Sequence, residues 1–277
     1  MVTAMSGDHA RKLLDGSRFA DVRWVAETGS TNADLLALAA ADAPDGTVLV
    51  ADHQTAGRGR LGRTWEAPPG ASLLCSVLMR PDLPASHLQL LSLATAIAAS
   101  DACHSVAGVR PRLKWPNDLV VASGGGVARL DDGSERKLGG ILAESTMSAT
   151  GGAAVVVGMG LNVDWPTELP DELAEIATAL NHHTDTEVDR EELLAAHLLG
   201  LEQLVEPLAT AEGREALLVR YRHLSATLGR RVRVDLGSGS LTGQAVDLDP
   251  EGHLLVELEG DIVPVAAGDV VHLRPAD

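Results

Sequence analysis

Hydrophobic and polar positions alternate along the first half of the chain in two distinct patterns. Apolar runs typical of strands, bounded by turn residues, lie within 19–27, 45–55, 68–81 and, on both sides of Pro116, 111–122. Apolar residues at helical spacing predict helices over 33–42 and 87–106. The polar residues at 30–32 are suitable N-caps for the first of these helices. Two further β segments are expected at 137–146 and 152–163.

The pattern changes twice in the second half of the chain. Helical patterns dominate 170–180 and 189–223. From about residue 228, short alternating strands separated by Gly, Asp and Pro predict a small β-barrel or sandwich. We therefore predict an α+β protein with two domains, a body of mixed β-sheet backed by helices at 1–224 and a small β domain at 225–277.

Composition limits the class of protein. The hydrophobic fraction of 45% suffices for a core, and the formal net charge of -17 argues against a general nucleic-acid binder, which presents a basic face. No N-terminal segment resembles a signal peptide, and no uninterrupted apolar run reaches the ~18 residues that span a bilayer. Cys75 and Cys103 form no spaced pattern. We expect two buried, reduced thiols in a cytoplasmic protein.

The segment GRGRLGR at 57–63 places three arginines on a glycine-rich loop of this acidic chain. It contains the dinucleotide fingerprint G-x-G-x-x-G, but Trp65 and the proline pair at 68–69 follow at once and prevent the helix that this motif requires. No P-loop sequence occurs. We therefore expect a loop that approaches a strongly anionic ligand, such as a nucleoside triphosphate; the alternative is a solvated basic turn.

Two more segments combine polar groups with glycine. KWPND at 114–118 brings three polar side chains into a strand region; the alternative is a turn with an Asp or Asn cap. Lys137, one of only three lysines, directly precedes a glycine pair at 139–140. GMGLN at 158–162 adds glycines at a strand end, which alone is commonplace in β-bulges.

Together these segments resemble one family closely, the biotin protein ligases, also called biotin–[acetyl-CoA-carboxylase] ligases. The resemblance runs from about residue 24 to the C-terminus and rests on STN at 30–32, QTAGRGRLGRTW at 54–65, KWPND at 114–118, KLGGILAE at 137–144 and GMGLN at 158–162. It implies a mixed-sheet catalytic domain backed by helices, plus a small SH3-like β-barrel domain. Because STN already stands at residue 30, we expect the ligase-only form, without the N-terminal DNA-binding domain of larger members.

The resemblance also implies an activity and its partners. Family members make biotinyl-5′-adenylate from biotin and ATP, release pyrophosphate, and pass the biotinyl group to one lysine of a biotin carboxyl carrier protein. We expect biotin and ATP as substrates, Mg²⁺ as the metal, and a carrier subunit of an acyl-CoA carboxylase as partner. Neither nucleic acid nor membrane is an expected partner. The oligomeric state, monomer or weak dimer, stays open.

Matching positions imply a role for each site residue. The expected catalytic set is Lys137, Arg60, Arg63 and Asp118. The expected biotin-binding set is Ser30, Thr31, Gln54, Gly57, Arg58, Lys137 and Gly140. The expected ATP and adenylate set is Arg60, Arg63, Trp65, Asn117, Asn162 and Arg274. Asp118 is also the candidate Mg²⁺ ligand, with helix or turn capping and orientation of the incoming lysine as alternatives, and Asn32 is expected to be structural.

Segments 57–70 and 123–136 have the composition of loops that order on a ligand. We expect both to be mobile without ligand and to close over the adenylate, because water would hydrolyse a mixed anhydride. Three alternative functions stay open: a lipoate-type ligase, a non-enzymatic biotin sensor or repressor, and an α/β nucleotide binder of another kind.

Overall fold

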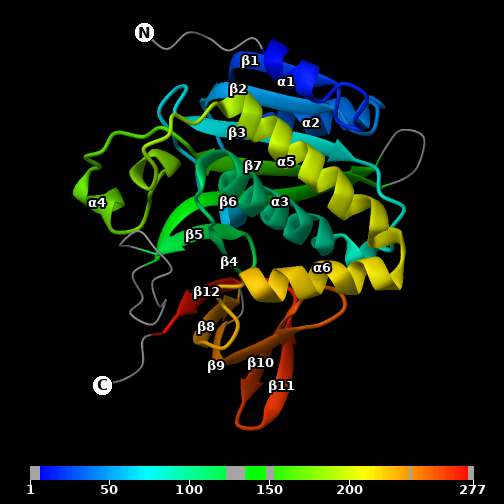
Figure 1. The fold of residues 1–277 in the computed structure, drawn as a ribbon. Helices are drawn as coiled ribbons and strands as arrows, with labels where there is room; N and C mark the ends of the chain where they lie inside the picture. The colour runs from blue at the N-terminus through cyan, green and yellow to red at the C-terminus, as the bar shows by residue number, and fades with distance from the viewer. Residues whose placement is uncertain (1–6, 123–134, 148–152, 237–238, 274–277) are drawn as a thin grey trace.

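The computed structural model describes residues 7–122, 135–147, 153–236 and 239–273. A seven-stranded sheet forms the centre of the larger domain, and the C-terminal residues form a separate five-stranded sheet below it (Figure 1). The strands of the larger sheet are β1 (Val22–Thr28), β2 (Val48–Gln54), β3 (Ser72–Met79), β4 (Arg112–Lys114), β5 (Asp118–Ala122), β6 (Glu135–Met147) and β7 (Ala153–Asn162). Their order in space is β1-β2-β3-β7-β6-β5-β4. The β1–β2 pair is parallel and the other pairs are antiparallel, so the sheet is mixed, as expected.

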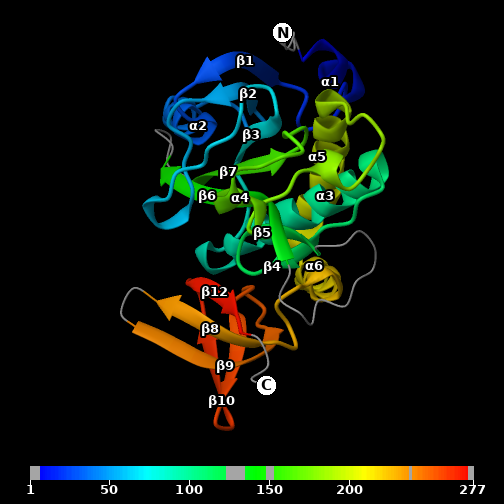
Figure 2. The ribbon, with the colours of Figure 1, turned by 90° about the vertical axis from the view of Figure 1, so that its left-hand side faces the viewer.

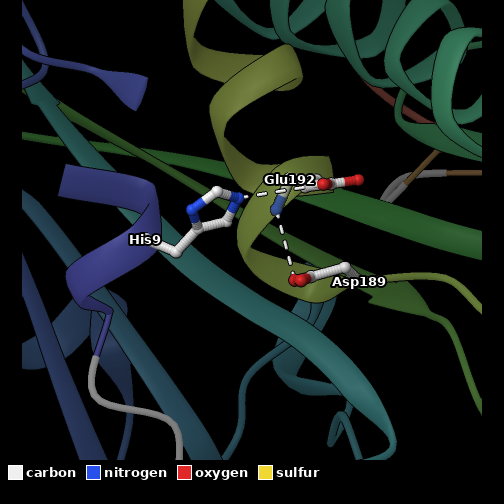
Figure 3. A group of neighbouring side chains, drawn as sticks. All are labelled: His9, Asp189 and Glu192. Carbon is white, nitrogen blue, oxygen red and sulfur yellow. Dashed lines mark hydrogen bonds and ion pairs between the residues drawn. The ribbon is translucent and has the colours of Figure 1, made fainter. Parts of the chain in front are cut away.

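Helices cover both faces of this sheet (Figure 2). The helices of the described residues are α1 (Asp8–Leu13), α2 (Thr31–Ala40), α3 (Gln89–Ala107), α4 (Asp171–Ala174), α5 (Arg190–Val205) and α6 (Ala211–Leu224). Helices α3 and α5 pack together on one face, and α2 lies on the other. The short helix α1 packs on α5, where His9 Nε2 lies 3.8 Å from Glu192 Oε1 (Figure 3).

The alternation of side chains along β2 explains the two helical layers. Val48 and Val50 join the large core beneath α3 and α5, whereas Leu49, between them, joins a smaller core with α2. Successive side chains of a strand point to opposite faces, so a run of consecutive apolar residues makes both faces of β2 apolar. Helix α2 begins where the sequence predicts, since the Ser30 hydroxyl accepts a hydrogen bond from Ala33 N.

Helix α3 is the central helix of the core. The stretch Ala85–Ala107 is, among the described residues, the one helix long and apolar enough to cross a membrane by length and composition. However, 72% of its most apolar window is buried inside the fold. Its apolar character is therefore accounted for by contacts with the sheet and with α5.

The C-terminal sheet is antiparallel throughout, in the order β11-β10-β9-β8-β12. Its strands are β8 (Arg231–Leu236), β9 (Gly239–Leu248), β10 (Leu254–Leu258), β11 (Asp261–Val265) and β12 (Asp269–His272). Trp115, only 1% exposed, ties it to the larger domain by donating a hydrogen bond from Nε1 to Gly252 O at 3.1 Å. The boundary that we place between residues 224 and 225 falls between α6 and β8 and stays a prediction.

The helices expected in the second half are partly wrong. Residues 170–180 contain only the four-residue α4, because the chain then runs beside β6, where Lys137 N donates to Ile176 O at 2.8 Å. The helical pattern at 189–223 is confirmed but divides into two helices, since Pro207 lies in a 3-10 turn between α5 and α6. The two cysteines are free and buried, as expected.

His197 is a fully buried titratable group of the core. It lies on α5, which packs against α3, and burial lowers the pKa of its imidazole to about 4. Because the unfolded chain takes up this proton near pH 6.5 and the folded protein near pH 4, the unfolded state binds more protons in this window. The stabilising effect of neutral His197 is thus complete above pH 6.5 and is lost as the pH falls towards 4.

We predict that His197→Leu loses less stability than the parent protein when the pH falls into the mildly acidic range. Between pH 7.5 and 5, His197 should lower the free energy of unfolding by about 2 kcal/mol in the parent protein. Urea unfolding at both pH values should show a fall smaller by this amount in His197→Leu. The exposed His104→Gln is the control and should fall as the parent does. An equal fall in His197→Leu would contradict this assignment.

Candidate active site

A pocket opens between the large sheet, the arginine-glycine loop (residues 57–65) and the C-terminal domain, with an internal volume of about 120 Å³. It brings together eleven of the fourteen residues expected from the sequence, which are Ser30, Thr31, Gln54, Arg58, Arg60, Arg63, Trp65, Asn117, Asp118, Lys137 and Gly140. These residues come from the start of α2, from the ends of β2 and β5, from β6 and from the loop itself. Segments far apart in the sequence therefore converge on one cavity.

The N-terminus of α2 forms a polar corner of the pocket. Gln54 Oε1 accepts hydrogen bonds from Thr31 N at 2.8 Å and from Thr31 Oγ1 at 3.1 Å. The Ser76 hydroxyl lies 2.7 Å from Thr31 Oγ1, and Ser30 caps the helix. Ser30 and Thr31 are about 5% and 4% exposed. The corner thus offers several fixed donors and acceptors in a small volume.

Asn32, which is expected to be structural, also lines the pocket. Its Nδ2 donates to Leu142 O at 3.1 Å and to Glu144 Oε2 at 2.9 Å. A Cβ at residue 158 would lie 2.1 Å from Asn32 Oδ1, so only glycine fits there. The same Glu144 oxygen accepts a hydrogen bond from Arg58 Nη2 at 3.2 Å. Asn32 therefore helps to place the carboxylate that holds Arg58.

The arginine-glycine loop is a hairpin rather than a helix start. Arg58 and Thr64 form an antiparallel bridge, and Trp65 N donates to Gly57 O at 3.0 Å. A side chain at position 57 would clash with Trp65 O, since its Cβ would lie 2.4 Å away. Leu61, at the tip, has a φ of 55° and is 72% exposed. The loop is thus not a dinucleotide-binding turn, as the sequence indicated.

Two arginines of the loop contact the C-terminal domain. Arg60 Nη1 donates to Asn117 Oδ1 at 3.1 Å and to Gly268 O at 3.2 Å. Arg63 Nη2 forms an ion pair with Asp269, which also lines the pocket. Burial lowers the pKa of Arg60, while the nearby Asp269 and Asp118 carboxylates act in the opposite direction. A guanidinium keeps its charge in proteins, so Arg60 is a partly desolvated cation for which an anion is a favourable neighbour.

Lys137 faces the pocket from β6. Its Nζ lies 2.7 Å from Asp118 Oδ1 as an ion pair, although the contact is not aligned as a hydrogen bond. The same ammonium lies 5.4 Å from the centre of the Trp65 ring, within the range of a cation–π contact. The indole packs against glycine backbone, because a Cβ at 140 or 160 would come within 3.1 or 2.5 Å of it. Lysine, carboxylate and indole thus form one group.

The Cys75 thiol lies on the wall of the pocket and does not act as a nucleophile. The residue is 1% exposed, and burial raises its pKa to about 12. Because the reactive form of cysteine is the thiolate, a thiol with this pKa stays protonated near neutral pH. Cys75 therefore contributes a small apolar surface.

Two expected residues, Gly57 and Asn162, do not line the pocket. Gly57 supports the loop from behind through its contacts with Trp65. Asn162, 2% exposed, donates from Nδ2 to Thr178 O at 2.9 Å, and its Oδ1 has no partner among the described residues. Arg274 lies outside the described residues, as does most of the 123–136 segment.

Two groups of side chains have the spacing of metal ligands, and both lie away from the pocket. One is exposed and consists of His9, Asp189 and Glu192 (Figure 3), and the other consists of Asp249, Glu251 and His253. Within the described ranges, Asp118 belongs to no such group. A metal ion at Asp118 would therefore need ligands from a substrate, such as phosphate oxygens.

Sequence reasoning missed Asp269, Glu144 and the lining residues of β7. Asp269 lies in the C-terminal domain, more than 200 residues from the arginine that it pairs with. No local pattern marks such a contact. Gly158 and Gly160 were visible as part of a glycine-rich strand end, but their contacts with Asn32 and Trp65 are set by the packing of distant segments.

Comparison with known proteins gives the same picture in sequence and in structure. Residues 25–162 match the model of the biotin/lipoate A/B protein ligase family, and residues 227–273 match that of the biotin protein ligase C-terminal domain. A biotin–[acetyl-CoA-carboxylase] ligase of Mycobacterium tuberculosis is 43% identical over 94% of this chain and 91% of its own length. The bifunctional ligase/repressor BirA of Escherichia coli is 30% identical over 84% of this chain and 68% of its own length.

A solved structure extends the match to three dimensions. The biotin protein ligase from Aquifex aeolicus in complex with biotin and ATP has a TM-score of 0.75 and 29% identity, and it covers 93% of this chain and 100% of its own. The match covers most of the chain, and the two family models together span all the residues that line the pocket. The chain therefore belongs to the biotin protein ligases of the biotin/lipoate protein ligase family.

Proposed function

We propose that this protein activates biotin as biotinyl-5′-adenylate and transfers the biotinyl group to a lysine of a biotin carboxyl carrier protein. In the first step a biotin carboxylate oxygen attacks the α-phosphorus of ATP, and the bond to the β-phosphate oxygen breaks, releasing pyrophosphate. In the second step the lysine amine attacks the acyl carbon, AMP leaves, and the amine loses a proton. The observation that carries the proposal is the convergence of Arg58, Arg60, Arg63 and Lys137 on one pocket.

The first step needs these cations because it joins two anions. Two unit charges about 4 Å apart interact by roughly 4 kcal/mol at an effective dielectric constant of about 20. A triphosphate multiplies this repulsion against the biotin carboxylate. Cations that are already in place offset it and stabilise the charge that develops in the transition state. Arg60, Arg63 and Lys137 take this part in the proposal.

The polar corner at α2 is suited to the head of biotin, a neutral ureido ring on an apolar bicycle. Ser30, Thr31 and Gln54 would provide hydrogen-bond partners for the ureido group. Glycine backbone at residue 140 and the main chain of Arg58 would lie against the flat part of the ligand. A small number of fixed polar groups that set the orientation of a ligand is usual in small-molecule sites.

Lys137 is the proposed group between the two substrates. In the structure its ammonium contacts Asp118, so it would exchange this carboxylate for the biotin carboxylate and an α-phosphate oxygen. Asp118 would then be available, together with phosphate oxygens, to hold Mg²⁺, which prefers one or two carboxylates plus phosphate. The ion would neutralise phosphate charge.

In the proposal, Trp65, Asn117, Asn162 and Arg274 form the nucleotide side of the site. Trp65 and Asn117 line the pocket, and Asn162 would lie near the ribose with its unpaired Oδ1. Arg274 stays a proposal from the family resemblance alone. The same proposal includes a domain boundary between residues 224 and 225 and a carrier subunit of an acyl-CoA carboxylase as the partner. It also includes a cytoplasmic location and a monomer or weak dimer as the oligomeric state.

We predict biotin-dependent release of pyrophosphate from ATP by the purified protein. Replacing biotin with lipoate should reduce the rate to background, because the C-terminal domain matches that of biotin ligases. Transfer should be measured with radiolabelled biotin, ATP and a carrier domain, and with a carrier whose acceptor lysine is replaced by Arg as the control. Equal rates with lipoate would favour the lipoate-type alternative.

We predict that Lys137→Met lowers the rate of biotinyl-adenylate formation by about 100-fold or more, the scale seen when one fixed donor to a transition state is removed. Lys137→Arg should recover only part of the rate, because a planar fork cannot reproduce a point charge. Lys12→Met, at an exposed position of helix α1, is the matched control and should retain the parent rate. A Lys137→Met rate within a few-fold of the parent would remove this role.

We predict that Arg60→Gly weakens retention of the adenylate more than it weakens biotin capture. The variant should release biotinyl-adenylate into solution and label lysines of unrelated proteins, because a cation near the phosphate is lost. Labelling of serum albumin by the variant and by the parent measures the effect, with Arg23→Gly on β1 as the control. Unchanged release of adenylate would contradict the role given to Arg60.

A further inference from the structure

The turn between β11 and β12 of the C-terminal domain reaches the active-site pocket. Asp269, the first residue of β12, lines this pocket. Its carboxylate pairs with Arg63 Nη2, and the carbonyl before it, Gly268 O, accepts a hydrogen bond from Arg60 Nη1 at 3.2 Å. Two arginines of the loop are thus held by adjacent residues of the other domain.

Each guanidinium is held through a single nitrogen. Arg60 uses Nη1 for both Gly268 O and Asn117 Oδ1, and Arg63 uses Nη2 for Asp269. Among the described residues, the other nitrogens of these two groups make no hydrogen bond or ion pair with protein. A guanidinium is a rigid fork of five N–H donors. Anchoring one nitrogen therefore limits the orientation of the fork and leaves the other donors for a ligand.

The turn itself is fixed from behind. A Cβ at residue 268 would lie 2.6 Å from Val234 Cγ1, so the turn packs directly on β8. Asp269 is paired in register with Asp235 of β8. The Asp269 side chain is 21% exposed, whereas that of Arg63 is 68% exposed. The carboxylate is therefore the fixed partner, and the long arginine is the one whose position is restrained.

Contacts between the domains hold the turn at the pocket. Glu135 of β6 pairs with Arg230 at 2.9 Å and lies 3.0 Å from His272 Nδ1 of β12. The Glu135 and His272 side chains are 8% and 7% exposed. These buried contacts act on the same strand that begins with Asp269. The position of Asp269 relative to Arg63 is thus set by the packing of one domain on the other.

We propose that Asp269 is a positioning residue through which the C-terminal domain orients Arg63, and with Gly268 O also Arg60, toward the phosphates of the nucleotide. The identity of this nucleotide as ATP rests on the proposed function. Whether removal of the Asp269 charge weakens or strengthens ATP binding separates positioning from simple charge repulsion. Asp269 is an anion beside an anionic ligand, so repulsion alone predicts that removing its charge improves ATP binding. Positioning predicts weaker binding.

The test compares Asp269→Asn with the parent protein in biotin-dependent pyrophosphate release. The KM for ATP should rise by about threefold to fivefold, the upper scale of a partly exposed ion pair, while the KM for biotin stays the same. Asp269→Glu should recover part of the loss. Asp261→Asn, at the β10–β11 hairpin, removes the same charge from the same domain and should leave both KM values unchanged. An unchanged or lower KM for ATP in Asp269→Asn would overturn the proposal.

A double-mutant cycle with Arg63→Ala asks whether Asp269 acts through Arg63. In the Arg63→Ala background, Asp269→Asn should change the KM for ATP by less than about twofold, because the group that it orients is missing. If instead the two substitutions raise the KM for ATP by factors that multiply in full, Asp269 has a role independent of Arg63, such as support of the C-terminal fold. That result would count against the proposal.

Tryptic cleavage within the arginine-glycine loop, without added substrates, tests the contact independently of enzymatic activity. Asp269→Asn should be cut there several times faster than the parent or Asp261→Asn, because loss of the anchor favours opening of the loop. Equal cleavage would overturn the proposal even in an active enzyme. Absence of biotin-dependent pyrophosphate release from the parent would refute the proposed function instead, and the cleavage result would still decide whether Asp269 holds the loop.

Discussion

The pairing of the pocket's cations with acceptors of the protein itself is the interaction on which the site depends. Four positive side chains converge in a chain whose net charge is -17. Left unpaired they would repel one another, and burial would add a desolvation cost. Each instead has its own acceptors, which are Glu144 for Arg58, Asn117 and Gly268 O for Arg60, Asp269 for Arg63, and Asp118 for Lys137. The cations are thereby placed before any anion reaches them, which is how electrostatic preorganisation lowers a barrier.

This pairing also explains why the site needs two domains. The acceptors lie at the start of β5, on β6, and at Gly268 and Asp269 where β12 begins, so the smaller domain contributes directly to the pocket. Trp115, which is 1% exposed and directly follows β4, and the Glu135 contacts connect the domains near the strands that carry Asp118 and Lys137. The fold therefore holds the arginine-glycine loop between the two domains, and rigid support is what fixed catalytic groups require.

The sequence was sufficient for whatever depends on local pattern. It predicted the strands, a helix capped within residues 30–32, the absence of a dinucleotide-binding helix start at the arginine-glycine loop, and eleven pocket residues through their motif positions. It could not predict Asp269, because an ion pair across 206 positions leaves no local trace. The helix expected at 170–180 failed for a similar reason, since backbone pairing with Lys137 overrides local propensity. Pro207, by contrast, was a visible break that the pattern at 189–223 should have included.

The most direct measurement is a crystal structure of the protein soaked with biotin and a non-reactive ATP analogue. If the account is correct, Lys137 Nζ has left Asp118 and lies within hydrogen-bond distance of both the biotin carboxylate and an α-phosphate oxygen, with Arg60 and Arg63 turned toward the phosphates. An ammonium still paired with Asp118, together with a loop turned away from the nucleotide, would contradict it.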